Sequence, residues 1–158
     1  MSEISVYTVD EERLKTLAAS LAPQCKTGDC LLLIGELGAG KTSFARAFIH
    51  ALQQSESEEV VSPTFTLVQT YQTKAAPVAH FDLYRIKHAQ ELQEIGLDDA
   101  LQQGITLIEW PQIAQNWLPA ASLTVSIGFV TNGNERSITL SSPDSSWCHR
   151  VPQPREVA

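Results

Sequence analysis

The 158-residue sequence has few cysteines and no long apolar run. Its three cysteines, Cys25, Cys30 and Cys148, include no C-x-x-C pair. An odd number in this arrangement indicates neither a disulfide framework nor a zinc site, and it fits a reducing compartment. No apolar stretch approaches the roughly 20 residues that cross a bilayer, and the first residues lack the basic and apolar regions of a signal peptide. We therefore expect a cytoplasmic protein that makes no contact with a membrane.

Positive charge is also scarce. The chain carries 11 Lys and Arg residues against 18 Asp and Glu residues, which gives a formal net charge of −7 at pH 7. Direct binding to a nucleic acid backbone needs a surplus of basic residues to displace counterions. The composition therefore predicts that any role on RNA runs through a protein partner or through a local basic patch.

One stretch with a specific chemical meaning is GELGAGKT, at residues 35–42. It fits the P-loop pattern G-x-x-x-x-G-K-[ST] at every fixed position, after the apolar run 30–34 and before a helical pattern. A glycine-rich backbone turns its N–H groups around phosphate, and the following helix N-terminus favours negative charge. Lys41 would reach the β- and γ-phosphates, and the Thr42 hydroxyl would ligate Mg²⁺. The residues expected around the phosphates are Leu37, Gly38, Ala39, Gly40, Lys41 and Thr42.

The rest of the pattern predicts an α/β fold: a P-loop NTPase-like mixed sheet flanked by helices. The core is expected to be mostly parallel, with antiparallel strands and a C-terminal hairpin. The segments 67–73 and 78–82 are joined by so short a turn that they are expected to pair antiparallel. Asn132-Gly133, between alternating runs at 123–130 and 135–140, is a strong hairpin signal.

The sequence shows no sign of a second domain. At this length and with 43% hydrophobic residues, one folded domain is the default, and we assign it to residues 1–142. The tail over residues 143–158 is rich in Ser and Pro, so it is expected to be flexible and loosely held.

Two acidic residues end apolar strands, Asp82 and Glu109. Ligands of α/β sheets bind at the carboxyl ends of strands, and ATP hydrolysis needs carboxylates to hold Mg²⁺ and to position water. Glu109 follows the more apolar run, but the residues alone leave open which acid ligates the metal. Alternation places His80, Asp82 and Tyr84 on one face. His80 by itself indicates neither a catalytic base nor a metal ligand.

Thr64 lies in a loop ahead of a strand. This placement is that of the switch threonine of GTPases, which reaches Mg²⁺ when the γ-phosphate is present, and it is equally that of an ordinary turn. The sequence has no Asn-Lys-x-Asp guanine-reading element and no Asp-x-x-Gly second switch. ATP is therefore favoured over GTP.

Four stretches occur in a fixed order: GELGAGKT at 35–42, SPTFTL at 62–67, HFDLYR at 80–85 and LIEWP at 107–111. Together they resemble the TsaE (YjeE) family of small bacterial P-loop ATPases, over roughly residues 5–140. The resemblance implies slow ATP hydrolysis in the synthesis of threonylcarbamoyladenosine on tRNA. It also implies TsaD and TsaB as protein partners, with tRNA met only indirectly through that complex.

The resemblance also implies roles for single residues. Lys41 and Thr42 would hold phosphate and Mg²⁺, and Glu109 matches the acid associated with Mg²⁺. Thr64 matches the switch-like threonine, and Asp82 matches an acid needed for activity. Four of these five residues are thus candidates for catalysis: Lys41, Thr64, Asp82 and Glu109.

Family analogy further places the adenine between the start of the first helix near Asp10 and the hairpin tip near Gly133. Two other function classes fit the P-loop, a small-molecule kinase and a nucleotide-sensing module without catalysis. A kinase would need a lid that carries arginines. Only Arg85 and Arg136 lie in suitable places between the P-loop and the tail, so the ATPase is favoured.

Overall fold

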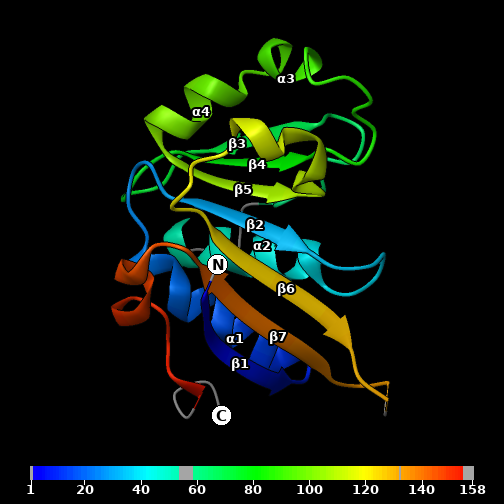
Figure 1. Cartoon of the computed structure of the whole chain (residues 1–158), viewed down its shortest axis with the longest axis vertical. Helices are drawn as coiled ribbons and strands as arrows, with labels where there is room; N and C mark the ends of the chain where they lie inside the picture. The colour runs from blue at the N-terminus through cyan, green and yellow to red at the C-terminus, as the bar shows by residue number, and fades with distance from the viewer. Residues whose placement is uncertain (1, 54–58, 132, 155–158) are drawn as a thin grey trace.

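The computed structural model describes residues 2–53, 59–131 and 133–154. Its centre is a seven-stranded sheet in the order β1-β7-β6-β2-β5-β4-β3 (Figure 1). The strands are β1 (Ser2–Val9), β2 (Cys30–Ile34), β3 (Val68–Tyr71), β4 (Val78–Asp82), β5 (Ile105–Glu109), β6 (Leu123–Phe129) and β7 (Arg136–Ser142). Strands β6, β2, β5 and β4 pair in parallel. The pairs β1–β7, β6–β7 and β3–β4 are antiparallel, which confirms the predicted mixed sheet and C-terminal hairpin.

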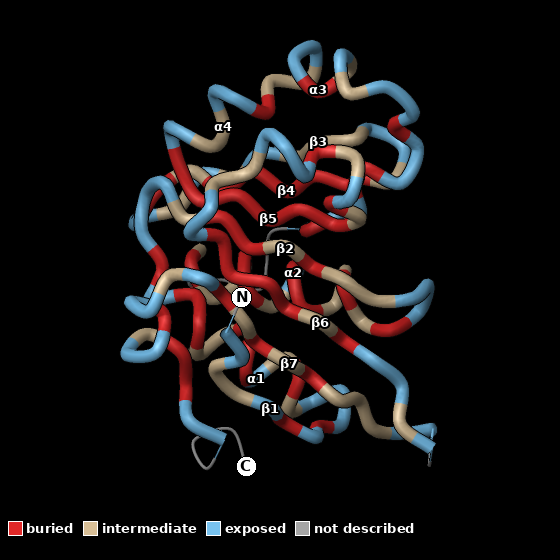
Figure 2. Tube along the Cα trace, in the orientation of Figure 1, coloured by how far each residue is buried: buried red, intermediate tan, exposed pale blue. Residues whose placement is uncertain are grey.

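Helices cover both faces of this sheet. The α-helices are α1 (Glu11–Leu21), α2 (Lys41–Gln53), α3 (Glu91–Glu94) and α4 (Leu97–Gln103), and the 3₁₀ helices are η1 (Ala22–Gln24), η2 (Pro111–Trp117) and η3 (Ser145–His149). Helices α1 and α2 pack together on one face, in the core that contains Leu107, whereas α3, α4 and η2 pack on the other, in the core that contains Ile108. Figure 2 shows buried residues running through the central strands. This double cover explains why the parallel strands are mostly apolar.

The first helix, α1, begins directly after Asp10, which caps it. The Asp10 carboxylate accepts a hydrogen bond from the backbone N–H of Arg13 at 2.8 Å, and Glu11 and Glu12 occupy the first turn. A side-chain cap satisfies a free helix N–H, and acidic residues there are favoured by the helix dipole. Asp10 therefore has a structural role that is independent of any ligand.

The described part of the tail that begins at residue 143, predicted to be loosely held, packs against the body of the protein. Strand β7 continues to Ser142, and η3 follows. Trp147 is 1% exposed, and its indole N–H donates to the Ala121 carbonyl at 2.8 Å. The Arg150 guanidinium lies 3.8 Å from the Trp147 ring centre and pairs with Asp29. Burial of one large aromatic side chain thus fixes a stretch whose Ser and Pro content suggested a flexible tail. Residues 155–158 of that tail, like residue 132 at the hairpin tip, lie outside the described residues.

Replacing Trp147 by alanine is expected to destabilise the fold by about 3–5 kcal/mol, because it removes a buried aromatic side chain and leaves a cavity. The matched control is Trp117→Ala, since Trp117 is 36% exposed and should cost much less. Urea unfolding monitored by circular dichroism measures both. Equal midpoints for the two variants would contradict a packed tail.

The cysteines behave as the sequence predicts, in that all three are free. Burial raises the pKa of the Cys25 and Cys30 thiols to about 12, so both stay protonated at neutral pH, whereas Cys148 is exposed. Within the described part of the chain, no helix has the length and apolar character required to span a bilayer.

Candidate functional site

The P-loop connects β2 to α2, and Lys41 is the first residue of that helix. Two of its glycines are required by close packing. A Cβ at Gly40, whose φ is +122°, would lie 2.8 Å from the Leu14 side chain on α1. A Cβ at Gly35 would lie 2.6 Å from the Ile127 carbonyl oxygen on β6. The loop therefore fits between α1 and β6 only without these side chains, so the motif glycines fix its position as well as its shape.

Lys41 is held inside the loop. Its ammonium group donates to the carbonyls of Gly35 at 2.6 Å and Glu36 at 2.9 Å, and the side chain is only 5% exposed. It also lies 4.3 Å from the centre of the Trp110 ring, a cation–π distance. Burial lowers the pKa of Lys41, and the nearby Glu109 carboxylate opposes that shift. The cation is thus fixed between the loop and Trp110.

Trp110 forms a wall of the site through an unusual backbone conformation. Its φ and ψ are 57° and 58°, in the left-handed region that bulky residues rarely adopt. Such conformations cost on the order of 1–3 kcal/mol and cluster at functional sites. The turn, followed by Pro111, directs the indole over Lys41, and the Tyr84 ring lies 4.9 Å from it, centre to centre.

The two strand-end acids lie side by side. Asp82 and Glu109 are register partners at the ends of β4 and β5, and both side chains are buried. The Thr42 hydroxyl donates to the two Glu109 carboxylate oxygens at 3.1 and 3.3 Å. The structure therefore brings together the two predicted magnesium ligands, Thr42 from α2 and Glu109 from β5.

The imidazole of His80, on β4, contacts the same carboxylate. His80 Nε2 lies 2.7 Å from Glu109 Oε2. Sequence reasoning gave His80 no role, although alternation had placed it on the same face as Asp82. Tyr84, predicted on that face as well, lies beyond the end of β4 and is exposed.

Thr64 belongs to a neighbouring cluster. Its hydroxyl donates to Asp82 Oδ2 at 3.2 Å and lies 2.7 Å from the Ser62 hydroxyl. The other Asp82 oxygen accepts from the Tyr84 backbone N–H at 3.0 Å. The loop ends at Leu67, which has a φ of 70°. Strand β3 therefore begins at Val68, one residue later than the strand predicted over 67–73, and it ends at Tyr71. Thr64 is thus tied to Asp82, while Thr42 is tied to Glu109.

A cavity of about 260 Å³ lies beside the P-loop. It is bounded by Glu11 and Leu14 of α1, by the backbone at residues 38–40, and by the hairpin at Gly133 and Arg136. Leu37 is exposed at the loop. Of the two positions expected around adenine, Gly133 lines this cavity, whereas Asp10 caps α1 and its neighbour Glu11 takes the lining position.

Arg136 ties the hairpin to the P-loop. Its Nε donates to the Ala39 carbonyl at 3.1 Å, and its Nη1 donates to the carbonyls of Gly133 and Glu135 at 3.1 and 3.0 Å. The sequence does not predict this contact, because Arg136 and Ala39 are far apart in the chain and meet only in the folded protein.

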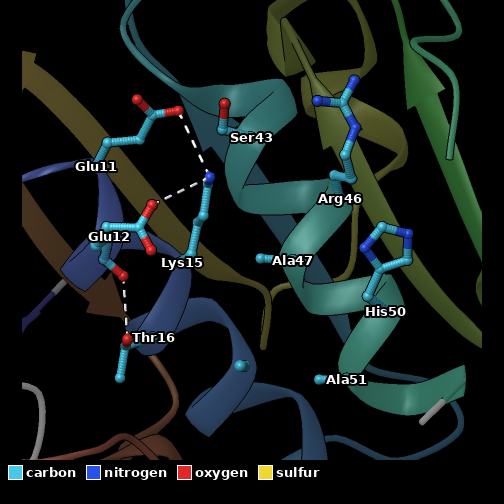
Figure 3. A pocket seen from close by; sticks show the side chains of 10 residues that line it. Glu11, Glu12, Lys15, Thr16, Ser43, Arg46, Ala47, His50 and Ala51 are labelled. Carbon is cyan, nitrogen blue, oxygen red and sulfur yellow. Dashed lines mark hydrogen bonds and ion pairs between the residues drawn. The ribbon is translucent and has the colours of Figure 1, made fainter. Parts of the chain in front are cut away.

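A larger cavity of about 710 Å³ lies between α1 and α2 (Figure 3). Lys15 points into it and is paired with Glu11 at 3.8 Å and Glu12 at 3.5 Å, while Arg46 and His50 line the opposite side from α2. Its lining residues come from these two helices, and those of α2 all follow the P-loop motif in the chain. Three residues of the P-loop motif, Gly38, Ala39 and Gly40, line the smaller cavity. Lys41 and Thr42 follow them directly in the chain, so we place the functional site there.

Comparison with known proteins shows the family of this chain. The sequence model of the family described as Threonylcarbamoyl adenosine biosynthesis protein TsaE matches residues 8–138. The chain belongs to the TsaE family. The protein named tRNA threonylcarbamoyladenosine biosynthesis protein TsaE from Rickettsia felis is 41% identical over 139 residues, which cover 87% of this chain and 80% of that protein. The protein of the same name from Bacillus subtilis is 36% identical over 143 residues, covering 90% and 87%.

The fold agrees as well. The crystal structure of YdiB from Bacillus subtilis matches with a TM-score of 0.73 and 29% identity, over 93% of this chain and 91% of YdiB. The TsaE match spans the P-loop, both strand-end acids, β6 and the start of β7, and it stops before the packed tail around Trp147. The whole candidate site therefore lies within the family's region.

Proposed function

We propose that this member of the TsaE family is a cytoplasmic ATPase that acts in the synthesis of threonylcarbamoyladenosine on tRNA. One observation carries the enzymatic part. Beside a cavity that the P-loop lines, the Thr42 hydroxyl donates to the buried Glu109 carboxylate, and the Lys41 ammonium group lies near enough to interact with its charge. The names of the relatives support the pathway.

The phosphates of ATP would bind at the P-loop. The backbone N–H groups of residues 37–42 and the N-terminus of α2 favour negative charge, and Lys41 supplies a full positive charge. The adenine would extend into the cavity between α1 and the hairpin, near Glu11 and Gly133. Asp10 would support this wall indirectly, because it caps α1, which carries Glu11.

Mg²⁺ fits the donors at this place. It prefers hard oxygen ligands and commonly combines one or two carboxylates with nucleotide phosphates. Thr42 and Glu109 present a hydroxyl and a carboxylate to each other. Among the described residues, no group of three or more His, Cys, Asp or Glu side chains is placed to hold a metal by itself. Thr42 and Glu109 would therefore hold Mg²⁺ jointly with the phosphates, where it neutralises charge on them.

Asp82 and Thr64 would help to orient the water molecule that attacks ATP. In hydrolysis, a water oxygen attacks the γ-phosphorus while the bond to the β–γ bridging oxygen breaks, which releases ADP and phosphate. Asp82 is buried next to Glu109 and is an acceptor that can orient this water. Thr64, which donates to Asp82, would follow the nucleotide state as a switch residue.

Turnover by the chain alone is expected to be slow. Arginine that stabilises the transferring phosphoryl group is a major source of rate in this chemistry. Arg136 is occupied by three carbonyls, and Arg85 lies over the exposed Phe65 ring at 5.1 Å. Because both arginines already have these contacts, the structure also disfavours a kinase whose lid carries arginines. We infer that TsaD and TsaB stimulate turnover, and the net charge of −7 favours tRNA contact through these partners.

The test is phosphate release from ATP and Mg²⁺, with the chain alone and after addition of TsaD and TsaB. We expect slow release that rises with the partners. ATP binding without turnover in either condition would instead identify a nucleotide-sensing module. Transfer of phosphate to a metabolite without a partner would identify a kinase.

A further inference from the structure

His80 is a polar residue at a fully buried position next to the candidate site, where an apolar side chain could fill the same space. His80 is 0% exposed on β4, where its register partner on β5 is the core residue Leu107. Burial of an imidazole costs free energy unless its nitrogen atoms are hydrogen-bonded. Among the described residues, His80 Nδ1 has no hydrogen-bond partner, and Nε2 has Glu109. The polar interaction of His80 is thus directed at one carboxylate.

That carboxylate is clamped from two sides. An ionised carboxylate only accepts hydrogen bonds, so the 2.7 Å contact requires that His80 Nε2 donates to Glu109 Oε2. Thr42 donates to the same carboxylate, at 3.1 Å to Oε1 and 3.3 Å to Oε2. The shorter hydrogen bond from His80 therefore fixes Oε2, and Oε1 is the oxygen nearer to the P-loop threonine.

We propose that His80 is a positioning residue for the magnesium–nucleotide site, which orients the Glu109 carboxylate toward the metal. The role rests on the proposed function, because it concerns the acid assigned to Mg²⁺. Hydrogen-bonding partners of metal ligands fix ligand orientation, and their loss typically costs 10–100-fold in metal affinity. In this role His80 would act through Glu109, with which it is hydrogen-bonded, and not by contact with the phosphates or the water.

Three substitutions separate this role from simple packing. In His80→Gln, the amide nitrogen can reach the position of Nε2 and still donate. In His80→Asn, the shorter amide keeps polarity but does not reach Glu109. In His80→Leu, the volume is filled without a donor, so this variant remains informative if the Asn variant does not fold. The matched control is His149→Gln, because His149 is exposed in η3, on the tail.

The measured quantity is the affinity of the ADP complex for Mn²⁺, which serves as a probe for Mg²⁺. The concentration of free Mn²⁺ is monitored by electron paramagnetic resonance. ADP affinity in EDTA and thermal unfolding are recorded in parallel. We expect the Asn and Leu variants to bind Mn²⁺ about 10–100-fold more weakly, and the Gln variant and the control to stay near the wild type. ADP affinity in EDTA should not change in any of them.

Two results overturn the role of His80 alone: wild-type Mn²⁺ affinity in the Leu variant, or a loss in the Gln variant as large as in the Leu variant. The proposed function fails in a different way. If the wild-type chain binds no metal–nucleotide complex, the ATPase assignment falls first and the positioning role falls with it.

Discussion

Alanine in place of Lys41 is expected to lower ATP turnover by about 10²-fold or more, since it removes an electrostatic stabiliser of the transferring phosphoryl group. The loss should be large because Lys41 lies within the phosphate-binding loop itself. Lys41 is enclosed by the carbonyls of Gly35 and Glu36 and by the Trp110 ring. Arg136, the cation on the adjoining hairpin, is already bonded to three carbonyls.

The measurement is kcat for phosphate release, at saturating ATP and with TsaD and TsaB present. Lys15→Ala is the matched control, because Lys15 lines the larger cavity between α1 and α2 and is paired there with Glu11 and Glu12. This control should keep wild-type turnover. If Lys15→Ala loses turnover and Lys41→Ala keeps it, the site lies between the two helices and the P-loop assignment is wrong.

The parts of the fold that are local in sequence were predictable. The P-loop carries its own signature, the Asp10 cap and the acidic first turn mark the start of α1, and apolar runs mark β2 and β5. The mixed sheet followed from the short turn between β3 and β4 and from the hairpin signal. These features depend on neighbours within a few residues, which a sequence displays directly.

The parts that depend on register or on distant contacts were not predictable. The contact between His80 and Glu109 depends on how β4 pairs with β5, and the two residues are 29 positions apart. The link from Arg136 to Ala39 spans 97 positions. Trp147 orders the tail through Ala121, which no composition rule reveals. A strand-end acid is visible in the sequence, whereas the groups that orient it are set by tertiary packing.

Glu109→Ala is expected to lower turnover by about 10²-fold or more and to raise the Mg²⁺ concentration needed for half-maximal rate. The alanine also leaves His80 and Thr42 without their shared acceptor, so part of its effect is structural. Glu109→Gln separates these causes, because the amide oxygen still accepts hydrogen bonds while the negative charge is lost. We expect the Gln variant to unfold at a temperature nearer that of the wild type, yet to share the Mg²⁺ defect.

The neighbouring acid supplies the decisive comparison for this prediction. Asp82 is the register partner of Glu109 and is buried as well, but its carboxylate is bonded to Thr64 and to the backbone of Tyr84. Asp82→Asn should therefore lower kcat with little change in Mg²⁺ dependence, as expected for a group that orients water. Titration of turnover against Mg²⁺ for both amide variants distinguishes the two roles. If Glu109→Gln keeps the wild-type Mg²⁺ dependence and Asp82→Asn loses it, the metal belongs to Asp82.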